Sequence, residues 1–354
     1  MTGLSAVGLV VALGLTIGSF LNVCIYRLPR GESVVNPPSR CPSCGRGLRW
    51  FENVPVLGYL LLGGRCRTCR AAVSPMYPIV EAGTALVFLL QYWQLGWQPL
   101  LGVRLVFVAA LIALFVIDLQ HRILPNVITL PGVVIGVAAS LLFEPGWRAS
   151  LIGVAVGGGA LWAIREVYFR IRGEEVMGMG DVNLLAMIGA FLGWQLMLVT
   201  LLFASLAGSV FGGGMILLNR SNMKYALPFL GSFLAADVLM VWAFLGLQFT
   251  PLVPLLAGPL AIVGMLLTTG PVFLVILLGS FIVGALIMVG FFLAWRLTLL
   301  FALLTVPLIG LGMFLPNRDG LKFEVPFGSF LAVSAVITTY VGFPLLDWYR
   351  EFWP

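Results

Sequence analysis

The sequence predicts an all-α polytopic membrane protein, with a bundle of about twelve transmembrane helices and a small cytoplasmic zinc-binding loop domain. Of its 354 residues, 60% are hydrophobic and only 10% are charged, and the mean hydropathy is +1.07. A chain this apolar has too few polar residues to cover the surface of a soluble globule. Its long apolar runs, separated by short charged stretches, favour helices that cross a membrane.

The first predicted element is a transmembrane helix in residues 1–24. Its apolar run, "LSAVGLVVALGLTIGSFLNVCIY", has no basic residue before it and no small-residue cleavage site, and arginines follow it. A cleaved signal peptide normally has both a basic start and such a site. We therefore expect this helix to be retained.

The second element is an arginine-rich loop in residues 25–77. Between Tyr26 and Ser74 its arginines outnumber its two acids, Glu32 and Glu52. They are Arg27, Arg30, Arg40, Arg46, Arg49, Arg65, Arg67 and Arg70. Short loops rich in Lys and Arg stay in the cytoplasm, which places the N-terminus outside. The net charge of +6 then reflects membrane topology, so we expect a lipid environment and no nucleic-acid partner.

The remaining apolar runs predict a catalytic membrane bundle over 78–247 and further helices over 248–354. The expected helices after the loop cover 78–96, 100–118, 126–143, 149–168, 182–197, 198–218, 226–247, 252–269, 271–294, 297–315 and 325–346. This arrangement keeps the short basic stretches such as "DLQHR" and "NRSNMK" on the cytoplasmic side, as the loop requires.

Four cysteines in the loop are spaced as two CxxC pairs, Cys41 with Cys44 and Cys66 with Cys69. Two such knuckles supply four thiolates, the usual ligand set of a tetrahedral structural zinc ion. Disulfides are the alternative, but a reducing cytoplasm disfavours them. A redox motif is a further alternative, although it would need one pair only. A zinc ion would supply folding energy to a loop with little apolar mass of its own.

Two aspartates are expected at the cytoplasmic ends of different helices. Asp118 ends one run in "ALFVIDLQHRILPN", and Asp181 begins another after Gly-Met-Gly in "GMGDVNLLAMIG". A carboxylate at this depth costs several kcal/mol, so each needs a reason. If the two approach, one keeps a proton and the pair can activate water against a peptide bond. From the residues alone, interfacial or helix-capping aspartates are an equally good interpretation.

Together these stretches resemble the type IV prepilin peptidases, which cleave leaders and methylate the new N-terminus. The matching segments are "GSFLNVCIYRLPRG", "CPSCGRGLRWFENVPVLGYLLLGGRCRTC", "SPMYPIVEAGTAL", "IDLQHRILPN", "GMGDVNLLAMIGAFLGW" and "PFLGSFLAADVL". The double CxxC loop with both aspartate motifs is a specific combination, whereas GxGD alone also resembles presenilin-type intramembrane proteases. The chain departs from the family at Met76, where Arg is usual, and at Asn183, where Lys is usual.

The resemblance implies that Asp118 and Asp181 are catalytic. It also implies a bacterial inner-membrane enzyme that cuts prepilins or pseudopilins of type IV pilus or type II secretion systems after a leader glycine, on the cytoplasmic side. S-adenosylmethionine would then donate a methyl group to the new N-terminus, at a site that the residues do not indicate. The alternatives are a GxGD protease without methylation and, less consistent with the position of the acids, a transporter.

The C-terminal part contains a degenerate copy of residues 182–236. "VNLLAMIGAFLGW" aligns with "VGALIMVGFFLAW" at 283–295, and "TLLFA" recurs at 298–302. "NRSNMKYALPFLGSFLA" then pairs with "NRDGLKFEVPFGSFLA" at 317–332 after one gap. Ile282 stands where the first copy has Asp181, so the second copy cannot supply a dyad member. We expect it to pack beside the catalytic bundle. The substrates and the oligomeric state are not encoded in any recognisable motif.

Overall fold

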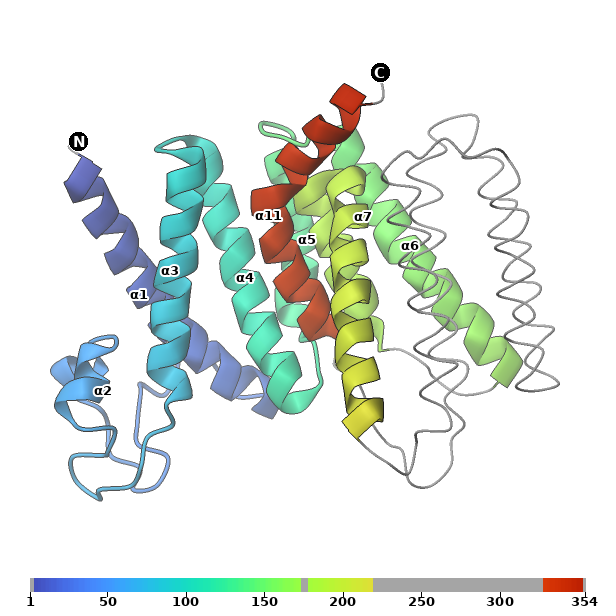
Figure 1. The fold of residues 1–354 in the computed structure, drawn as a ribbon. Helices are drawn as coiled ribbons and strands as arrows, with labels where there is room; N and C mark the ends of the chain where they lie inside the picture. The colour runs from blue at the N-terminus through green and yellow to red at the C-terminus, as the bar shows by residue number, and fades with distance from the viewer. Residues whose placement is uncertain (1–2, 173–177, 219–326, 353–354) are drawn as a thin grey trace. The chain divides into compact units, whose positions relative to one another are not determined.

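A computed structural model describes residues 3–172, 178–218 and 327–352, and this part of the chain is helical without strands. Its α-helices are α1 (Gly3–Arg27), α2 (Leu57–Leu61), α3 (Met76–Leu95), α4 (Pro99–His121), α5 (Asn126–Ser140), α6 (Trp147–Arg172), α7 (Met179–Leu218) and α11 (Phe327–Phe352). Figure 1 shows their arrangement. The helices expected at 226–247, 252–269, 271–294 and 297–315 lie outside the described residues, and so does most of the repeat.

Among the described residues, three helical segments are long and apolar enough to cross a membrane: Ser5–Arg30, Pro99–His121 and Met179–Leu201. Two shorter apolar helical segments, Asn126–Ser140 and Phe327–Gly342, accompany them. The membrane-helical class is therefore confirmed. The expected break at 197/198 is instead a kink at Gly193 within α7. Gly193 has a φ of 76°, which a residue with a side chain rarely adopts.

Helices in one half of the bundle approach each other through small residues. On α1, Gly14 and Gly18 face α3: a Cβ added to Gly14 would lie 2.5 Å from Ala85 Cα, and one added to Gly18 would lie 2.7 Å from Glu81 Cα. Lipid tails give no hydrophobic drive for association, so such close backbone contact supplies the packing energy between membrane helices.

The first part of α7 is packed by α5 and α6 in the same way. A Cβ at Gly153 of α6 would lie 2.4 Å from the Gly189 carbonyl oxygen of α7. The Ser150 hydroxyl donates a hydrogen bond to the Ala190 carbonyl at 2.8 Å. On the α5 side, a Cβ at Gly136 would lie 2.8 Å from the Ala190 methyl carbon. These contacts fix the position of the helix that begins with the GxGD motif.

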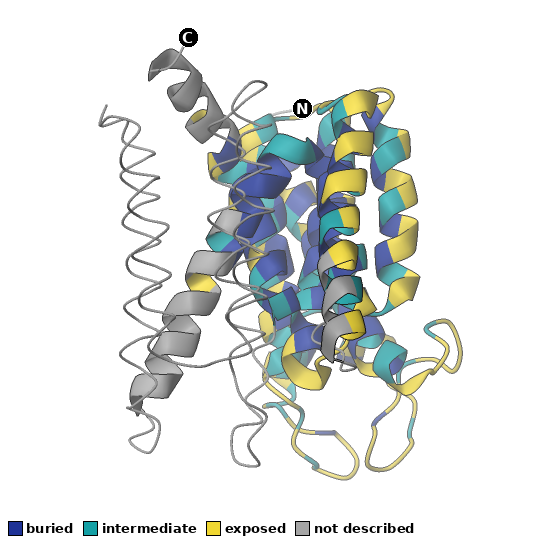
Figure 2. Ribbon diagram, turned by 90° about the vertical axis from the view of Figure 1, so that its right-hand side faces the viewer, coloured by how far each residue is buried: buried dark blue, intermediate teal, exposed yellow. Residues whose placement is uncertain are grey.

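The centre of the bundle is apolar, as Figure 2 shows by the buried residues turned inward. Helix α4 is buried along most of its length and contains five side chains with no exposed surface: Phe107, Val108, Leu111, Leu114 and Ile117. Phe107 stacks on Phe191 of α7 with ring centroids 4.5 Å apart. A helix that is hydrophobic on all sides is expected at the centre of such a bundle.

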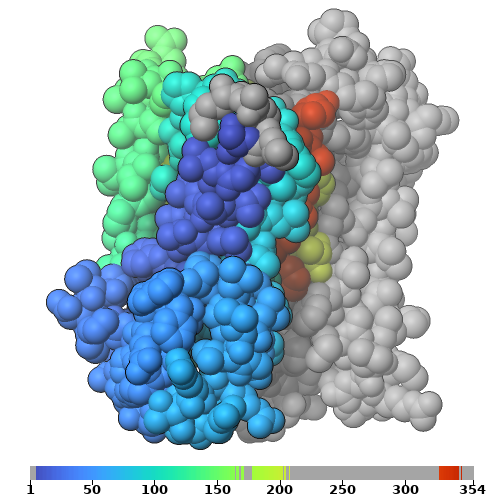
Figure 3. Space-filling view, turned by 90° about the vertical axis from the view of Figure 1, so that its left-hand side faces the viewer, coloured from blue at the N-terminus to red at the C-terminus, as the bar shows by residue number. Residues whose placement is uncertain are grey.

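The chain divides into two compact units, and the first comprises Met1–Leu161, Gly178–Met197 and Leu331–Pro354. Both aspartates and the four loop cysteines lie in this first unit. Within it, the segment between α1 and α3 forms a separate knob next to one end of α1, which Figure 3 shows in lighter blue below the helix. The knob contains two 3₁₀ turns, Leu28–Arg30 and Trp50–Asn53, and the short helix α2.

Candidate functional site

Asp118 lies in the last turn of α4 and is 5% exposed. Its backbone carbonyl accepts a hydrogen bond at 2.8 Å from the N–H of Arg122, the residue that ends the helix. Arg122 has a φ of 54°, a left-handed conformation that turns the chain sharply away from the helix axis. The turn holds the next segment close to Asp118.

Asp181 lies in the first turn of α7 and is half-buried. The two glycines of the GxGD motif have different surroundings. A Cβ at Gly180 would lie 2.7 Å from Leu124 Cβ, so this glycine lets the segment after α4 pack against α7. Among the residues that the structure describes, a Cβ at Gly178 would meet only the Gly180 nitrogen at 3.9 Å and the Asp181 Oδ2 at 4.0 Å. Gly178 is therefore the glycine that leaves space beside the carboxylate.

The two motif segments are held together by a direct side-chain contact. The Asn183 amide donates a hydrogen bond to the Asn126 Oδ1 at 2.9 Å, which links the first turn of α7 to the first turn of α5. With the Gly180–Leu124 contact, this bond places the ends of the helices beside each other. The carboxylates of Asp118 and Asp181 interact electrostatically in this arrangement. The structure thus brings the two predicted site residues together.

Glu81 does not join this pair. Its carboxylate accepts a hydrogen bond at 2.7 Å from the backbone N–H of Val56 in the loop, and the residue is 7% exposed. Val56 has a φ of 61°, which is unfavourable for a β-branched residue and persists only where the surroundings enforce it. Glu81 therefore fixes the cysteine loop to α3.

The four predicted cysteine ligands are gathered in one cluster. The Sγ atoms of Cys41, Cys44, Cys66 and Cys69 all lie within 4.8 Å of one another. Those of Cys41 and Cys69 are 3.8 Å apart. Four sulfurs at tetrahedral corners about 2.3 Å from a zinc ion would be separated by about 3.8 Å. The cluster has the dimensions needed to hold one metal ion. Cys24, the remaining cysteine, is buried in α1.

The two CxxC turns have the same backbone construction. The Cys41 N–H donates to the Arg46 carbonyl, and the Cys66 N–H donates to the Ala71 carbonyl, both at 2.8 Å. Arg70 occupies the position that Gly45 holds in the first turn, and both have positive φ angles, 58° and 71°. Two such turns present their sulfurs toward each other, which is the arrangement of zinc knuckles.

Backbone N–H groups favour the thiolate form of the first cysteine in each turn. The Cys69 N–H, followed by the Thr68 N–H, lowers the pKa of Cys66 to about 6. The Cys44 N–H likewise lowers the pKa of Cys41. For Cys69, the Ala71 N–H favours the thiolate. The sulfur of Cys66, burial and the other two sulfurs together outweigh this and raise its pKa to about 11. Four adjacent thiols cannot all ionise without a cation among them.

A partly buried ion pair supports the first turn. Arg46 contacts both carboxylate oxygens of Glu52, at 2.9 Å and 3.0 Å, and the Arg49 N–H donates to the same carboxylate at 2.8 Å. Arg46, followed by the Arg49 N–H, holds the pKa of Glu52 below its usual value. Glu52, the only described acid between the first CxxC turn and α2, therefore stabilises the loop itself.

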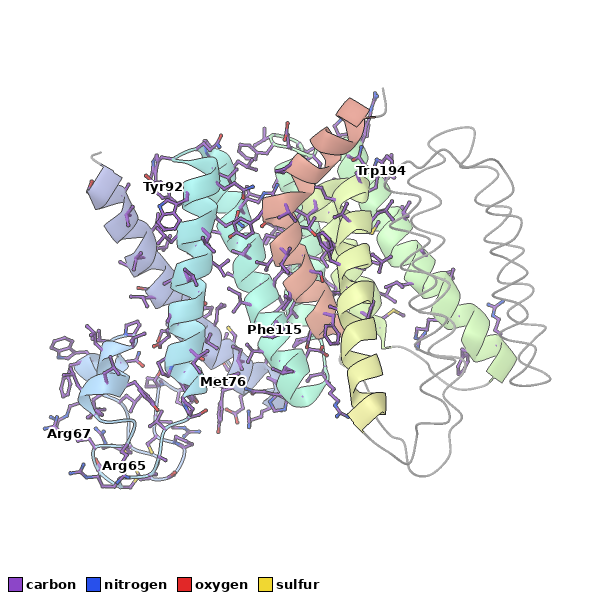
Figure 4. All side chains as sticks on the ribbon, viewed as in Figure 1. Arg65, Arg67, Met76, Tyr92, Phe115 and Trp194 are labelled. Carbon is purple, nitrogen blue, oxygen red and sulfur yellow. The ribbon has the colours of Figure 1, made fainter. Side chains whose placement is uncertain are left out.

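The aspartate pair and the cysteine cluster lie at the same end of the bundle. Figure 4 shows Phe115 of α4 and Met76 of α3 toward the end that carries Arg65 and Arg67, and Tyr92 and Trp194 toward the opposite end. Asp118 is one helical turn beyond Phe115, and α7 runs from Asp181 toward Trp194. A common end of the bundle is what the predicted topology requires, and the side of the membrane on which that end lies stays a prediction.

Comparison with known proteins gives two family matches. Residues 12–95 match the bacterial peptidase A24 N-terminal domain, and residues 105–213 match the type IV leader peptidase family. No solved structure matches the chain.

Several curated proteins are similar to the chain, and they share the name prepilin leader peptidase/N-methyltransferase. The protein from Pseudomonas aeruginosa is 36% identical over 252 residues, which cover 64% of this chain and 86% of that protein. The protein from Myxococcus xanthus is 45% identical over 206 residues, which cover 58% of this chain and 62% of that protein. The protein from Aeromonas hydrophila is 39% identical over 257 residues and is covered to 87%.

Proposed function

The chain belongs to the type IV leader peptidase family, and we propose that it is a prepilin leader peptidase and N-methyltransferase whose peptidase dyad is Asp118 and Asp181. One observation supports the dyad above all others. The Gly180–Leu124 contact and the Asn126–Asn183 hydrogen bond hold the last turn of α4 and the first turn of α7 side by side, so that a buried and a half-buried carboxylate lie at neighbouring helix ends. Two carboxylates within hydrogen-bond reach share one proton, which is the condition for aspartic protease chemistry.

The dyad hydrolyses the peptide bond directly, without a covalent intermediate. The ionised aspartate takes a proton from a water molecule as the water oxygen attacks the carbonyl carbon. The protonated aspartate donates its proton to the carbonyl oxygen, which prevents an anion from forming there. The tetrahedral intermediate then collapses: the C–N bond breaks, the leaving nitrogen takes the proton held by the first aspartate, and one hydroxyl of the intermediate returns its proton to the second aspartate as the new carboxyl group forms.

The substrate is a prepilin or pseudopilin, cut after its leader glycine at the cytoplasmic edge of the membrane. The open space at Gly178 next to the Asp181 carboxylate supports this, because an extended substrate backbone must come close to the attacking water. In this proposal the arginine-rich loop is cytoplasmic and the N-terminus is outside. The whole chain forms a bundle of about twelve helices in the bacterial inner membrane and serves a type IV pilus or type II secretion system.

Zinc is the metal that best suits Cys41, Cys44, Cys66 and Cys69. Four thiolates around one ion leave no position for water or substrate, so the ion would supply folding energy to the loop and no chemistry. Glu81 links the ordered loop to α3, because the Val56 N–H in the loop donates a hydrogen bond to the Glu81 carboxylate. The metal centre therefore stabilises the side of the bundle on which the dyad lies.

The methyl donor implied by the relatives' names is S-adenosylmethionine, which would transfer its methyl group to the new N-terminal amine. The described residues do not indicate a site for it. Acids commonly bind the ribose hydroxyls of such nucleosides, but Glu52 is bound by Arg46 and Glu81 by the Val56 N–H. The methyl-transfer step has no assigned residues in the described part of the chain.

Mass spectrometry of a co-expressed prepilin tests the activity. We expect the mature pilin to lack its leader and to carry the mass of one added methylene group. Cleavage without the added mass would show that the enzyme is a GxGD protease without methyltransferase activity. If the leader remains although the intact protein is folded and zinc-loaded, the peptidase assignment is wrong.

A further inference from the structure

Helix α11 is joined to α3 by hydrogen bonds in the interior of the bundle. The Gln91 amide donates to the Thr339 hydroxyl at 2.7 Å, and the Gln94 amide donates to the Thr339 carbonyl at 2.9 Å. The Tyr340 hydroxyl donates to the Val87 carbonyl at 3.1 Å. Gln91 has no exposed surface and Thr339 has 2%. Such polar bonds between apolar helices specify which helix pairs with which, because an unpaired amide in a dry interior is unfavourable.

The same helix also contacts α7. A Cβ added to Gly342 would lie 2.6 Å from Leu196 Cδ2, so only glycine allows α11 to approach α7 at this height. The inward residues of α11 are fully packed, and Leu331, Ala335 and Thr338 have no exposed surface. In Figure 1 α11, drawn in red, lies between α4 and α7. From Leu331 onward, helix α11 therefore belongs to the same compact unit as both aspartates.

This helix comes from the second copy of the internal repeat. Extending the alignment of "PFLGSFLA" with "PFGSFLA" without further gaps pairs Thr339 with Trp242, Tyr340 with Ala243 and Gly342 with Leu245. The first copy thus lacks both hydroxyls that bond α3 and has a bulky residue where α7 requires glycine.

The result also holds when the register is moved by one residue in the direction that pairs Gly342 with a glycine. Moving the alignment by one residue pairs Gly342 with Gly246, but Thr339 and Tyr340 then face Ala243 and Phe244. Neither of these side chains can form the hydrogen bonds to Gln91 and Val87. The two copies share the apolar pattern of a closing helix, and only the second has the side chains for this position.

We propose that the second copy, and not the first, supplies the helix that closes the catalytic unit against α3 and α7. The C-terminal extension is then a required part of the enzyme. It positions α7, whose first turn carries Asp181, against α3, whose Glu81 anchors the cysteine loop. The structural part of this proposal is independent of the peptidase assignment, and its consequence for activity rests on the proposed function.

Cysteine cross-linking tests which copy occupies the position, without any need for activity. In the full-length protein in membranes, Gln94→Cys is combined with Tyr340→Cys or with the matched control Ala243→Cys. A short bis-thiol reagent is added, and linked peptides are identified by mass spectrometry, with the unsubstituted chain as the blank. We expect a link between positions 94 and 340 and none between 94 and 243. A link to 243, or no link to 340, would overturn the proposal.

Substitutions at the hydrogen bond test its effect on catalysis. Thr339→Val leaves the Gln91 amide without its partner, and we expect kcat for leader cleavage to fall about 10-fold with KM unchanged and zinc retained. Gln91→Leu combined with Thr339→Val removes both polar groups and should recover most of the lost kcat. Trp242→Phe, the matched change in the first copy, should leave kcat unchanged. A loss with Trp242→Phe and none with Thr339→Val would reverse the assignment of the copies.

Discussion

The two glycines of the GxGD motif should respond differently to the same added methyl group. A Cβ at Gly180 would lie 2.7 Å from Leu124 Cβ and 3.2 Å from the Leu124 carbonyl oxygen. Two carbon atoms normally stay about 3.5–4.0 Å apart, so the segment after α4 must move by about 1 Å. A shift of about 1 Å in a catalytic group can cost about 100-fold in rate, and the overpacking itself costs about 1–3 kcal/mol. We therefore expect Gly180→Ala to lower kcat about 100-fold.

Gly178→Ala is the matched control, because its methyl group would meet no atom of the described residues closer than 3.9 Å. It should leave kcat nearly unchanged and raise KM, since it narrows the space that a substrate backbone would use. The assay is cleavage of a purified prepilin in detergent or nanodiscs, with zinc content and helical circular dichroism as measures of folding. Leu124→Gly should partly restore the Gly180→Ala enzyme. Full activity of Gly180→Ala, or equal kcat losses in both variants, would refute the packing argument.

Three further perturbations test the loop and the contact between the motifs. Removing the metal with a chelator, or substituting Cys66→Ser, should unfold the loop and expose its arginines to trypsin. The rate of trypsin cleavage should rise as the zinc content, measured in parallel, falls. Glu81→Ala removes the acceptor of the Val56 N–H, a charge-assisted bond worth about 1.5–3 kcal/mol, so trypsin should cleave the loop faster than in Glu81→Gln; equal rates would contradict the anchoring role. Asn183→Ala and Asn126→Ala should each reduce kcat. In the double variant, the loss of transition-state stabilisation should differ from the sum of the two single losses by about 0.5–3 kcal/mol. Strictly additive losses would argue against their hydrogen bond.

Much of the fold follows from the sequence, because a membrane-crossing helix needs a long apolar run and nothing more local. The expected helix at 100–118 corresponds to α4 (Pro99–His121), and that at 126–143 to α5 (Asn126–Ser140). The kink at Gly193 was not predicted at its place. An isolated glycine in an apolar run is common in membrane helices, and only the packing of α7 gives this one its left-handed conformation.

The residues of the candidate site could be predicted from the sequence, but the contacts that hold them in place could not. The spacing of Cys41, Cys44, Cys66 and Cys69 predicts their cluster, because two CxxC turns have few other uses. The contact between Asn126 and Asn183 was missed, since it joins residues far apart in the chain. A signal existed, because Asn183 is one of the chain's departures from the family pattern. The GxGD motif does not reveal that Leu124 fills the space beside Gly180.

The position of α11 could not be predicted from hydropathy, because both copies of the repeat end in a similar apolar run. The choice between them depends on single side chains, such as Thr339 against Trp242. These become informative only when the partner residue Gln91 on α3 is known. Polar side chains within otherwise apolar runs are therefore the residues to compare when a membrane protein contains a degenerate repeat.

The most direct measurement of the central claim is the rate of prepilin cleavage by Asp118→Asn and Asp181→Asn, each as purified, zinc-loaded protein. Asparagine has nearly the same shape as aspartate and cannot exchange the proton that the dyad shares. We expect each variant to fold and to bind prepilin, with kcat lower by about 10⁴-fold or more in both. Cleavage at a near-normal rate by either variant would show that the two carboxylates do not form the catalytic pair.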